Sequence, residues 1–240
     1  MRTAHLLQLI SSLAGEGEHA PRVLTAPSLN SLLRSILGSA SRETLNDARK
    51  TLVLQHVLTP VTRGLYLNNQ CKPRAVPAEA APYLRAGAVL SLQYVLGEIG
   101  VLNNPTAVVT AVVPLPKGGK AVPRTGAVAT RAARFRFHGM PERFFNILPA
   151  ELNDHRQLRP YPCATPERAL MDWIYLGLSP RAALTPPPLE LDLDDLDLRR
   201  LRRIARFFSM EEELQGLLAR IAEYSESPNV KQQANTSLGM

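Results

Sequence analysis

Residues 1–70 contain three segments in which apolar residues recur at helical spacing. Leucine and isoleucine occupy the i, i+3, i+4 and i+7 positions within residues 6–13 and again within residues 29–36, a pattern typical of helices that bury one face. Ser28 and Ser41 are the expected N-caps of the second and third helices, because a serine side chain accepts hydrogen bonds from the free amides of a first turn. The inward stripe of the third helix is Leu45, Ala48 and Leu52.

Two β-prone runs follow the third helix and predict a hairpin. They cover residues 56–61 and 65–67, and Gly64 between them supplies the positive φ that a tight turn needs. Another short β-prone run, residues 22–25, separates the first two helices. The order helix, strand, helix, turn, helix, hairpin is that of a winged helix-turn-helix, which we predict over residues 1–72.

The rest of the chain predicts a second domain, and the expected fold class is therefore α+β. Three prolines within residues 72–82 indicate a linker at its start. The expected elements are a helix at 83–97, strands at 106–113 and 134–138, a helix from Thr165 to about residue 176 and two closing amphipathic helices. We expect the mixed α+β domain over residues 73–224 and a disordered polar tail over residues 225–240.

The charge balance favours a polyanionic partner. The 240-residue chain carries 28 basic and 21 acidic residues, and the net charge of +7 is concentrated before residue 73. Off its apolar stripe, the third helix offers side chains that read bases or hold phosphates, and the hairpin tip adds an arginine. The expected DNA-binding residues are Arg42, Thr44, Asn46, Arg49, Lys50 and Arg63. The alternative interpretation is a solvated helix face or a protein-interaction module.

A second basic stretch lies between residues 117 and 143, where Glu142 is the only acid. Composition leaves two interpretations open: an interaction patch, or a solvated edge with a glycine-rich flexible loop. The residues of this predicted patch are Lys117, Lys120, Arg124, Arg131, Arg134 and Arg136.

Signatures of catalysis and metal binding are absent from the sequence. It contains no Walker A, HExxH, GxSxG or GxGxxG motif, and its five histidines are scattered. Cys71 and Cys163 share no close spacing, which favours a reducing, cytoplasmic setting over a disulfide scaffold or zinc site. The acidic run at residues 190–197 is better explained as the start of a helix capped by Asp194 or Asp195 than as a metal site. No apolar run reaches membrane-spanning length. We therefore expect no catalytic residue, cofactor, metal or membrane partner.

Three segments carry a resemblance to a known family. The runs RGLYL at 63–67, LRAGAVLSLQYVL at 84–96 and ATPERALMDWIYL at 164–176 resemble the AbiEi family, the antitoxins of type IV toxin–antitoxin systems of phage defence. The resemblance implies a non-catalytic protein whose winged helix represses its own operon by binding promoter DNA, expected at inverted repeats. It also implies a C-terminal antitoxin domain that counteracts a nucleotidyltransferase-like toxin without a stable complex.

Two functions from different classes thus remain open at the level of sequence. The first is the antitoxin and autorepressor that the resemblance implies. The second is a winged-helix transcriptional regulator or DNA-processing accessory protein, unrelated to a toxin, whose C-terminal domain senses a ligand or assembles a complex.

The third segment also has a structural explanation that does not depend on the family. Thr165 can cap a helix whose first turn holds Pro166 and Glu167, all three favoured at a helix start. We therefore expect no catalytic role for Glu167, Arg168 or Asp172, while an exposed Arg168 could contact a partner.

Overall fold

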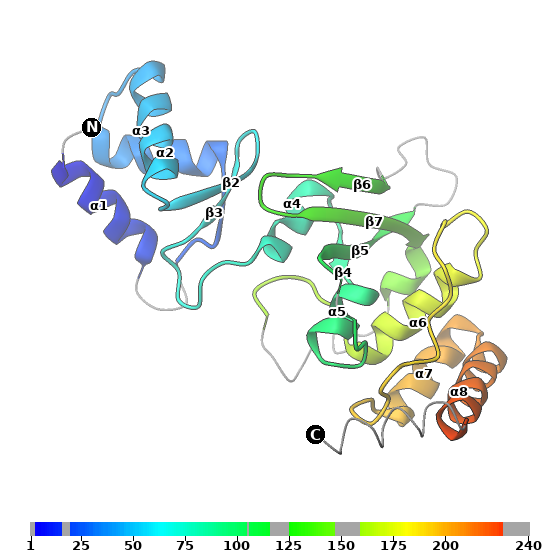
Figure 1. Ribbon diagram of the computed structural model, residues 1–240. Helices are drawn as coiled ribbons and strands as arrows, with labels where there is room; N and C mark the ends of the chain where they lie inside the picture. Colours follow the sequence, from blue (N-terminus) through cyan, green and yellow to red (C-terminus); the bar gives the residue numbers. More distant parts are fainter. Residues whose placement is uncertain (1–2, 16–19, 105, 116–124, 147–158, 228–240) are drawn as a thin grey trace, which may run out of the picture. The chain divides into compact units, whose positions relative to one another are not determined.

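The computed structural model describes residues 3–15, 20–104, 106–115, 125–146 and 159–227, and they form a mixed α+β fold (Figure 1). These residues divide into two compact units. The first unit comprises the chain up to Leu84 together with Val128–Arg134, and the second comprises Arg85–Ala127 together with the chain from Phe135 onward.

Three helices form the core of the first unit: α1 (Thr3–Ala14), α2 (Ala26–Leu37) and α3 (Arg42–Leu54). Ser41 caps α3, as its sequence predicts. The predicted cap of α2 is wrong, because Thr25 rather than Ser28 holds that position. Thr25 is extended and accepts from the Ser28 amide, and the Ser28 side chain accepts from the Thr25 amide in return, so Ser28 serves as the third residue of a capping box. Residues of the shared core include Leu9, Leu13, Leu29, Leu33, Leu45 and Leu52.

An antiparallel sheet completes this core. It contains β1 (Val23–Thr25), β3 (Leu65–Asn68) and β2 (Leu58–Thr62) in that order. The register pairs Leu24 with Tyr66 and Thr59 with Leu67, and it shifts between Pro60 and Thr62. Gly64 has a φ of 80°, as the predicted hairpin turn requires.

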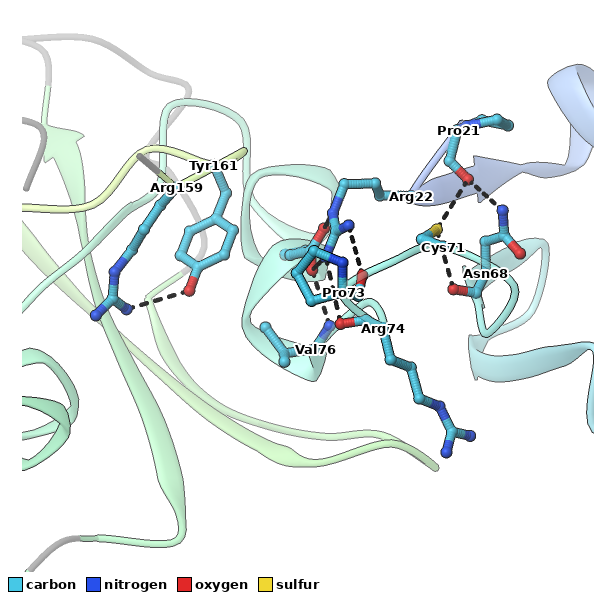
Figure 2. A network of polar contacts seen from close by, with 10 residues as sticks. Pro21, Arg22, Asn68, Cys71, Pro73, Arg74, Val76, Arg159 and Tyr161 are labelled. Carbon is cyan, nitrogen blue, oxygen red and sulfur yellow. Dashed lines mark hydrogen bonds and ion pairs between the residues drawn. The ribbon is translucent and has the colours of Figure 1, made fainter. Parts of the chain in front are cut away.

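The first unit extends beyond residue 72, the predicted end of the winged helix-turn-helix. It continues through η2 (Pro77–Ala80) and α4 (Ala81–Leu84). Arg22 next to β1 binds the buried Glu79 carboxylate with Nε–Oε2 and Nη2–Oε1 distances of 2.7 and 2.8 Å, and Nη1 donates to the Pro73 carbonyl (Figure 2). The Glu79 carboxylate also accepts from the Val76 amide. These bonds fasten the proline-rich segment to the sheet and explain why it is not a free linker.

The segment Val128–Arg134 joins the first unit from far along the chain. It connects β6 (Gly126–Ala129) to β7 (Arg134–Pro141). The Arg131 amide donates to the Val61 carbonyl at 3.1 Å, next to the end of β2, which is an outer strand of its sheet. The Thr130 hydroxyl donates to the Ala133 carbonyl at 2.7 Å and fixes the turn itself.

The second unit contains a sheet of order β4-β5-β7-β6, with β4 at Val89–Leu90 and β5 at Val108–Leu115. The predicted helix at 83–97 is wrong: this stretch holds the end of α4, then β4, then α5 (Gln93–Glu98). Positive φ values at Gly87 and Leu92 interrupt helical backbone, and Val89 pairs with Val112 of β5. β7 alternates exposed and buried residues from Arg134 to Phe137, as predicted.

The second unit also contains η3 (Glu142–Asn146) and three longer helices, α6 (Pro166–Gly177), α7 (Leu198–Phe208) and α8 (Glu211–Glu226). α6 packs against α5, α7 and α8 (Figure 1). Thr165 caps α6 as predicted. The cap of α7 is Asp197 rather than Asp194 or Asp195, because buried Glu167 accepts from the Asp197 amide at 2.9 Å and holds it at the helix start. Residues 228–240, most of the predicted disordered tail, lie outside the described residues.

Candidate nucleic-acid interface

The polar face of α3 is exposed because its apolar stripe packs inward. Leu45, Ala48 and Leu52 are buried, whereas Arg42, Thr44, Asn46 and Lys50 are exposed and Arg49 is half-buried. Ser41 fixes the first turn by accepting from the Thr44 amide at 3.2 Å. Residues predicted from spacing alone to face outward therefore do so.

A groove runs beside α3 and the β2–β3 hairpin within the first unit. Its volume is about 1250 Å³. α3 contributes Asn46, Arg49 and Lys50, and the hairpin contributes Arg63. The remaining lining residues are small, apolar or hydroxyl-bearing, with the exception of Arg131: Ala26, Val53, Leu54, Pro60, Val61, Thr62, Gly64, Tyr66, Ala129 and Thr130. Four cationic side chains thus line the groove, and none of the lining residues that the structure describes is acidic.

The side-chain contacts on α3 orient two of these cations. Arg49 donates to the Asn46 side chain and, through Nε, to the Leu45 carbonyl at 3.3 Å, which limits its freedom along the helix. Lys50 lies 3.3 Å from Asp47, but both side chains are largely exposed, at 75% and 65%. An exposed pair of this kind contributes at most about 1 kcal/mol, so a stronger anion can displace Asp47.

The structure brings together four of the six predicted DNA-binding residues. Asn46, Arg49, Lys50 and Arg63 line the groove. Arg42 and Thr44 lie on the exposed first turn of α3, outside the lining. The Thr44 hydroxyl is 3.0 Å from the Ser41 hydroxyl, so it is engaged in the cap.

Three residues of the predicted patch at 117–136, Arg131, Arg134 and Arg136, lie among the described residues. Lys117, Lys120 and Arg124 lie outside the described residues. Arg131 and Arg134 belong to the first unit, where Arg131 lines the groove. Arg136 belongs to the second unit and donates to the Ala183 carbonyl at 3.3 Å. Sequence reasoning missed the place of Arg131, because no local pattern indicates that a turn so far along the chain meets β2.

The TPERAL segment forms a buried network in the second unit. Arg168 is only 1% exposed, and its Nε lies 2.5 Å from Asp172 while Nη1 donates to the Phe144 carbonyl at 2.6 Å. Ser91 donates to the other Asp172 oxygen at 2.7 Å. Burial raises the pKa of Asp172, while Arg168 and Ser91 act in the opposite direction. The expectation that an exposed Arg168 could contact a partner is therefore wrong. Arg168, Asp172 and Ser91 instead hold α6 to its neighbours.

Other chemistry is sparse in the described part of the chain. No group of three or more histidine, cysteine or acidic side chains there could hold a metal ion. Cys71 and Cys163 are both buried free thiols, and burial raises the pKa of Cys71. Among the helices that the structure describes, none combines the length and the apolar character that crossing a bilayer requires.

The fold and the groove define a two-unit α+β protein with a basic surface in its first unit. No protein-family model and no curated protein matches the chain. Among solved structures, it is similar to the RV2827C protein from Mycobacterium tuberculosis, with 16% sequence identity and a TM-score of 0.54. The match covers 92% of this chain and 82% of that chain. At this identity the similarity concerns the fold alone.

Proposed function

We propose that the protein is a repressor whose first unit binds duplex DNA through α3 and the β2–β3 hairpin. The observation that carries the proposal is the shared groove, in which Arg49 and Lys50 of the helix and Arg63 of the hairpin lie together and no described lining residue is acidic. Phosphate neutralisation by such cations supplies much of the affinity of proteins for DNA. The element order supports the proposal, because it is that of winged helices, which place a helix in the major groove.

The side chains on α3 have different roles in this proposal. Asn46 and the exposed Arg42 are the candidates for base reading, since asparagine pairs with adenine and arginine with guanine in the major groove. Lys50 and Arg63 hold the sugar-phosphate backbone, which fixes the register but carries no sequence information.

We further propose that this repressor is the cytoplasmic antitoxin of a type IV toxin–antitoxin system. The support is the resemblance to the AbiEi family, whose motifs fall on the hairpin at residues 63–67 and on α6 at residues 164–176. In this proposal the second unit counteracts a nucleotidyltransferase-like toxin, and no residue of the chain is catalytic.

A mobility-shift assay with the DNA upstream of the chain's own coding sequence tests the DNA-binding proposal. The full-length protein should retard this fragment more than an unrelated fragment of equal length. The triple variant Arg49→Ala, Lys50→Ala, Arg63→Ala should lose the retardation, because three phosphate or base contacts are removed. Arg220→Ala, an exposed arginine on α8 of the second unit, is the matched control and should bind as wild type. Equal binding by wild type and the triple variant would refute the assignment.

A further inference from the structure

The turn at Val128–Arg134 contributes one cation, Arg131, to the lining of the groove, and the polar groups of Thr130 bond within the turn. Thr130 Oγ1 donates to the Ala133 carbonyl and accepts from the Ala132 and Ala133 amides at 3.2 and 3.0 Å. The Thr130 amide donates to the Ala133 carbonyl. The Arg131 guanidinium is exposed and has no hydrogen bond or ion pair with any described residue.

The main chain places Arg131 beside the hairpin. Its amide donates to the carbonyl of Val61, two residues before Arg63. Arg63 is also exposed and also has no ion pair among the described residues. Two guanidinium groups, from segments far apart in the sequence, therefore line the same groove, and none of its described lining residues is an acid that would offset their charge.

We propose that Arg131 makes a third point of contact with DNA, so that the groove holds one sugar-phosphate strand of the duplex between α3, the hairpin and the turn. This inference rests on the proposed function and specifies it. The groove has a volume of about 1250 Å³, whereas one turn of duplex is about 34 Å long and its major groove alone is about 12 Å wide, so the groove is too small for the whole duplex. It can accept one backbone, whose phosphates match four cations among described lining residues that include no acid.

In this proposal the turn adds affinity that does not depend on the DNA sequence. A phosphate contact contributes affinity on any sequence, whereas a base contact contributes on the cognate sequence only. Arg131 acts on the backbone, so its removal weakens cognate and unrelated duplexes to the same extent. Removal of Asn46, a base-reading candidate, affects the cognate duplex more.

Salt titrations of the full-length protein test this inference, with fluorescein-labelled duplexes from the upstream DNA and from unrelated DNA as probes. The slope of log K against log salt should become shallower by about 0.9 for Arg131→Ala on both probes. Arg131→Lys should keep the wild-type slope because it keeps the charge. Arg134→Ala is the matched control, an exposed arginine of the same turn that does not line the groove, and should leave the slope unchanged.

The outcomes separate this inference from the proposed function. Wild-type binding with an unchanged slope for Arg131→Ala overturns the inference and leaves the proposed function standing. Tighter binding by Arg131→Ala also overturns it, because the turn would then obstruct the duplex. If the wild-type protein binds neither duplex but binds an acidic peptide through the same residues, the inference and the proposed function are both overturned. The melting temperature of Arg131→Ala should equal that of wild type, since its side chain is exposed.

Discussion

At the scale of single residues, His138 makes the stability of the second unit depend on pH. Burial, with Arg136 as a second cause, lowers its pKa from 6.5 to about 4, although a hydrogen bond to the Ala182 backbone acts in the opposite direction. The unfolded chain therefore binds more protons than the folded chain between these values, and stability falls as the pH drops through about 6.5 toward 4. The loss should reach up to about 3 kcal/mol.

Urea unfolding at several pH values tests this expectation. The single tryptophan, Trp173 on α6, reports the second unit by its fluorescence. Wild type should lose more stability than His138→Gln between pH 7 and pH 4.5. Equal losses would mean that His138 does not carry the effect.

The Arg22–Glu79 ion pair is the second group whose removal should be costly. The Glu79 side chain is 1% exposed and that of Arg22 is 18% exposed. Arg22→Met leaves a buried carboxylate without its counter-charge, which should cost about 3 kcal/mol in urea unfolding followed by far-UV circular dichroism. Lys50→Met, at the exposed pair with Asp47, is the control and should cost less than about 1 kcal/mol. Similar small costs for both variants would contradict the role of Glu79 in fastening the segment beyond residue 72.

At the scale of elements, the hairpin turn depends on Gly64. Its φ is 80°, and an added Cβ would lie 3.1 Å from the Ala26 Cβ. Gly64→Ala should therefore destabilise the first unit by about 1 kcal/mol or more. Gly216→Ala in α8 meets no atom within 4 Å and should instead stabilise by about 0.5–1 kcal/mol. If thermal unfolding showed that Gly64→Ala stabilises the protein, the positive φ of residue 64 in the β2–β3 turn would be contradicted.

The sequence correctly predicted those helix starts that depend on hydrogen bonds between residues close together in the chain. Ser41 and Thr165 were correct caps because the bond joins each to an amide only three residues away. The stretch at 83–97 was mispredicted because the pairing of Val89 with Val112 outweighs its helical spacing. Likewise, no spacing rule relates Asp197 to Glu167 or Arg131 to Val61. The cap of α7 and the position of the Val128–Arg134 turn beside the groove therefore could not be predicted from the sequence.

At the scale of the whole molecule, the boundary between the two units does not permit a simple truncation at residue 72. Cutting at residue 72 would remove the partners of residues 77–84 and 128–134, which belong to the first unit. The antitoxin proposal is therefore best tested in the full chain. Co-expressed with a nucleotidyltransferase-like gene from its own operon, both wild type and the Arg49, Lys50, Arg63 triple alanine variant should restore growth.

Loss of rescue in a folded triple variant would show that the first unit takes part in neutralisation. Absence of any such gene beside the coding sequence would instead favour a winged-helix regulator without a toxin.

The salt dependence of duplex binding tests the central claim most directly. Full-length wild type and the Arg49, Lys50, Arg63 triple alanine variant are titrated with the upstream duplex over a range of salt concentrations. If each lost cation is a phosphate contact, the variant should show a slope of log K against log salt that is shallower by about 2.7, together with weaker binding at every salt concentration. Wild-type affinity that does not change with salt, or identical slopes for the two proteins, would contradict the claim that this groove binds DNA.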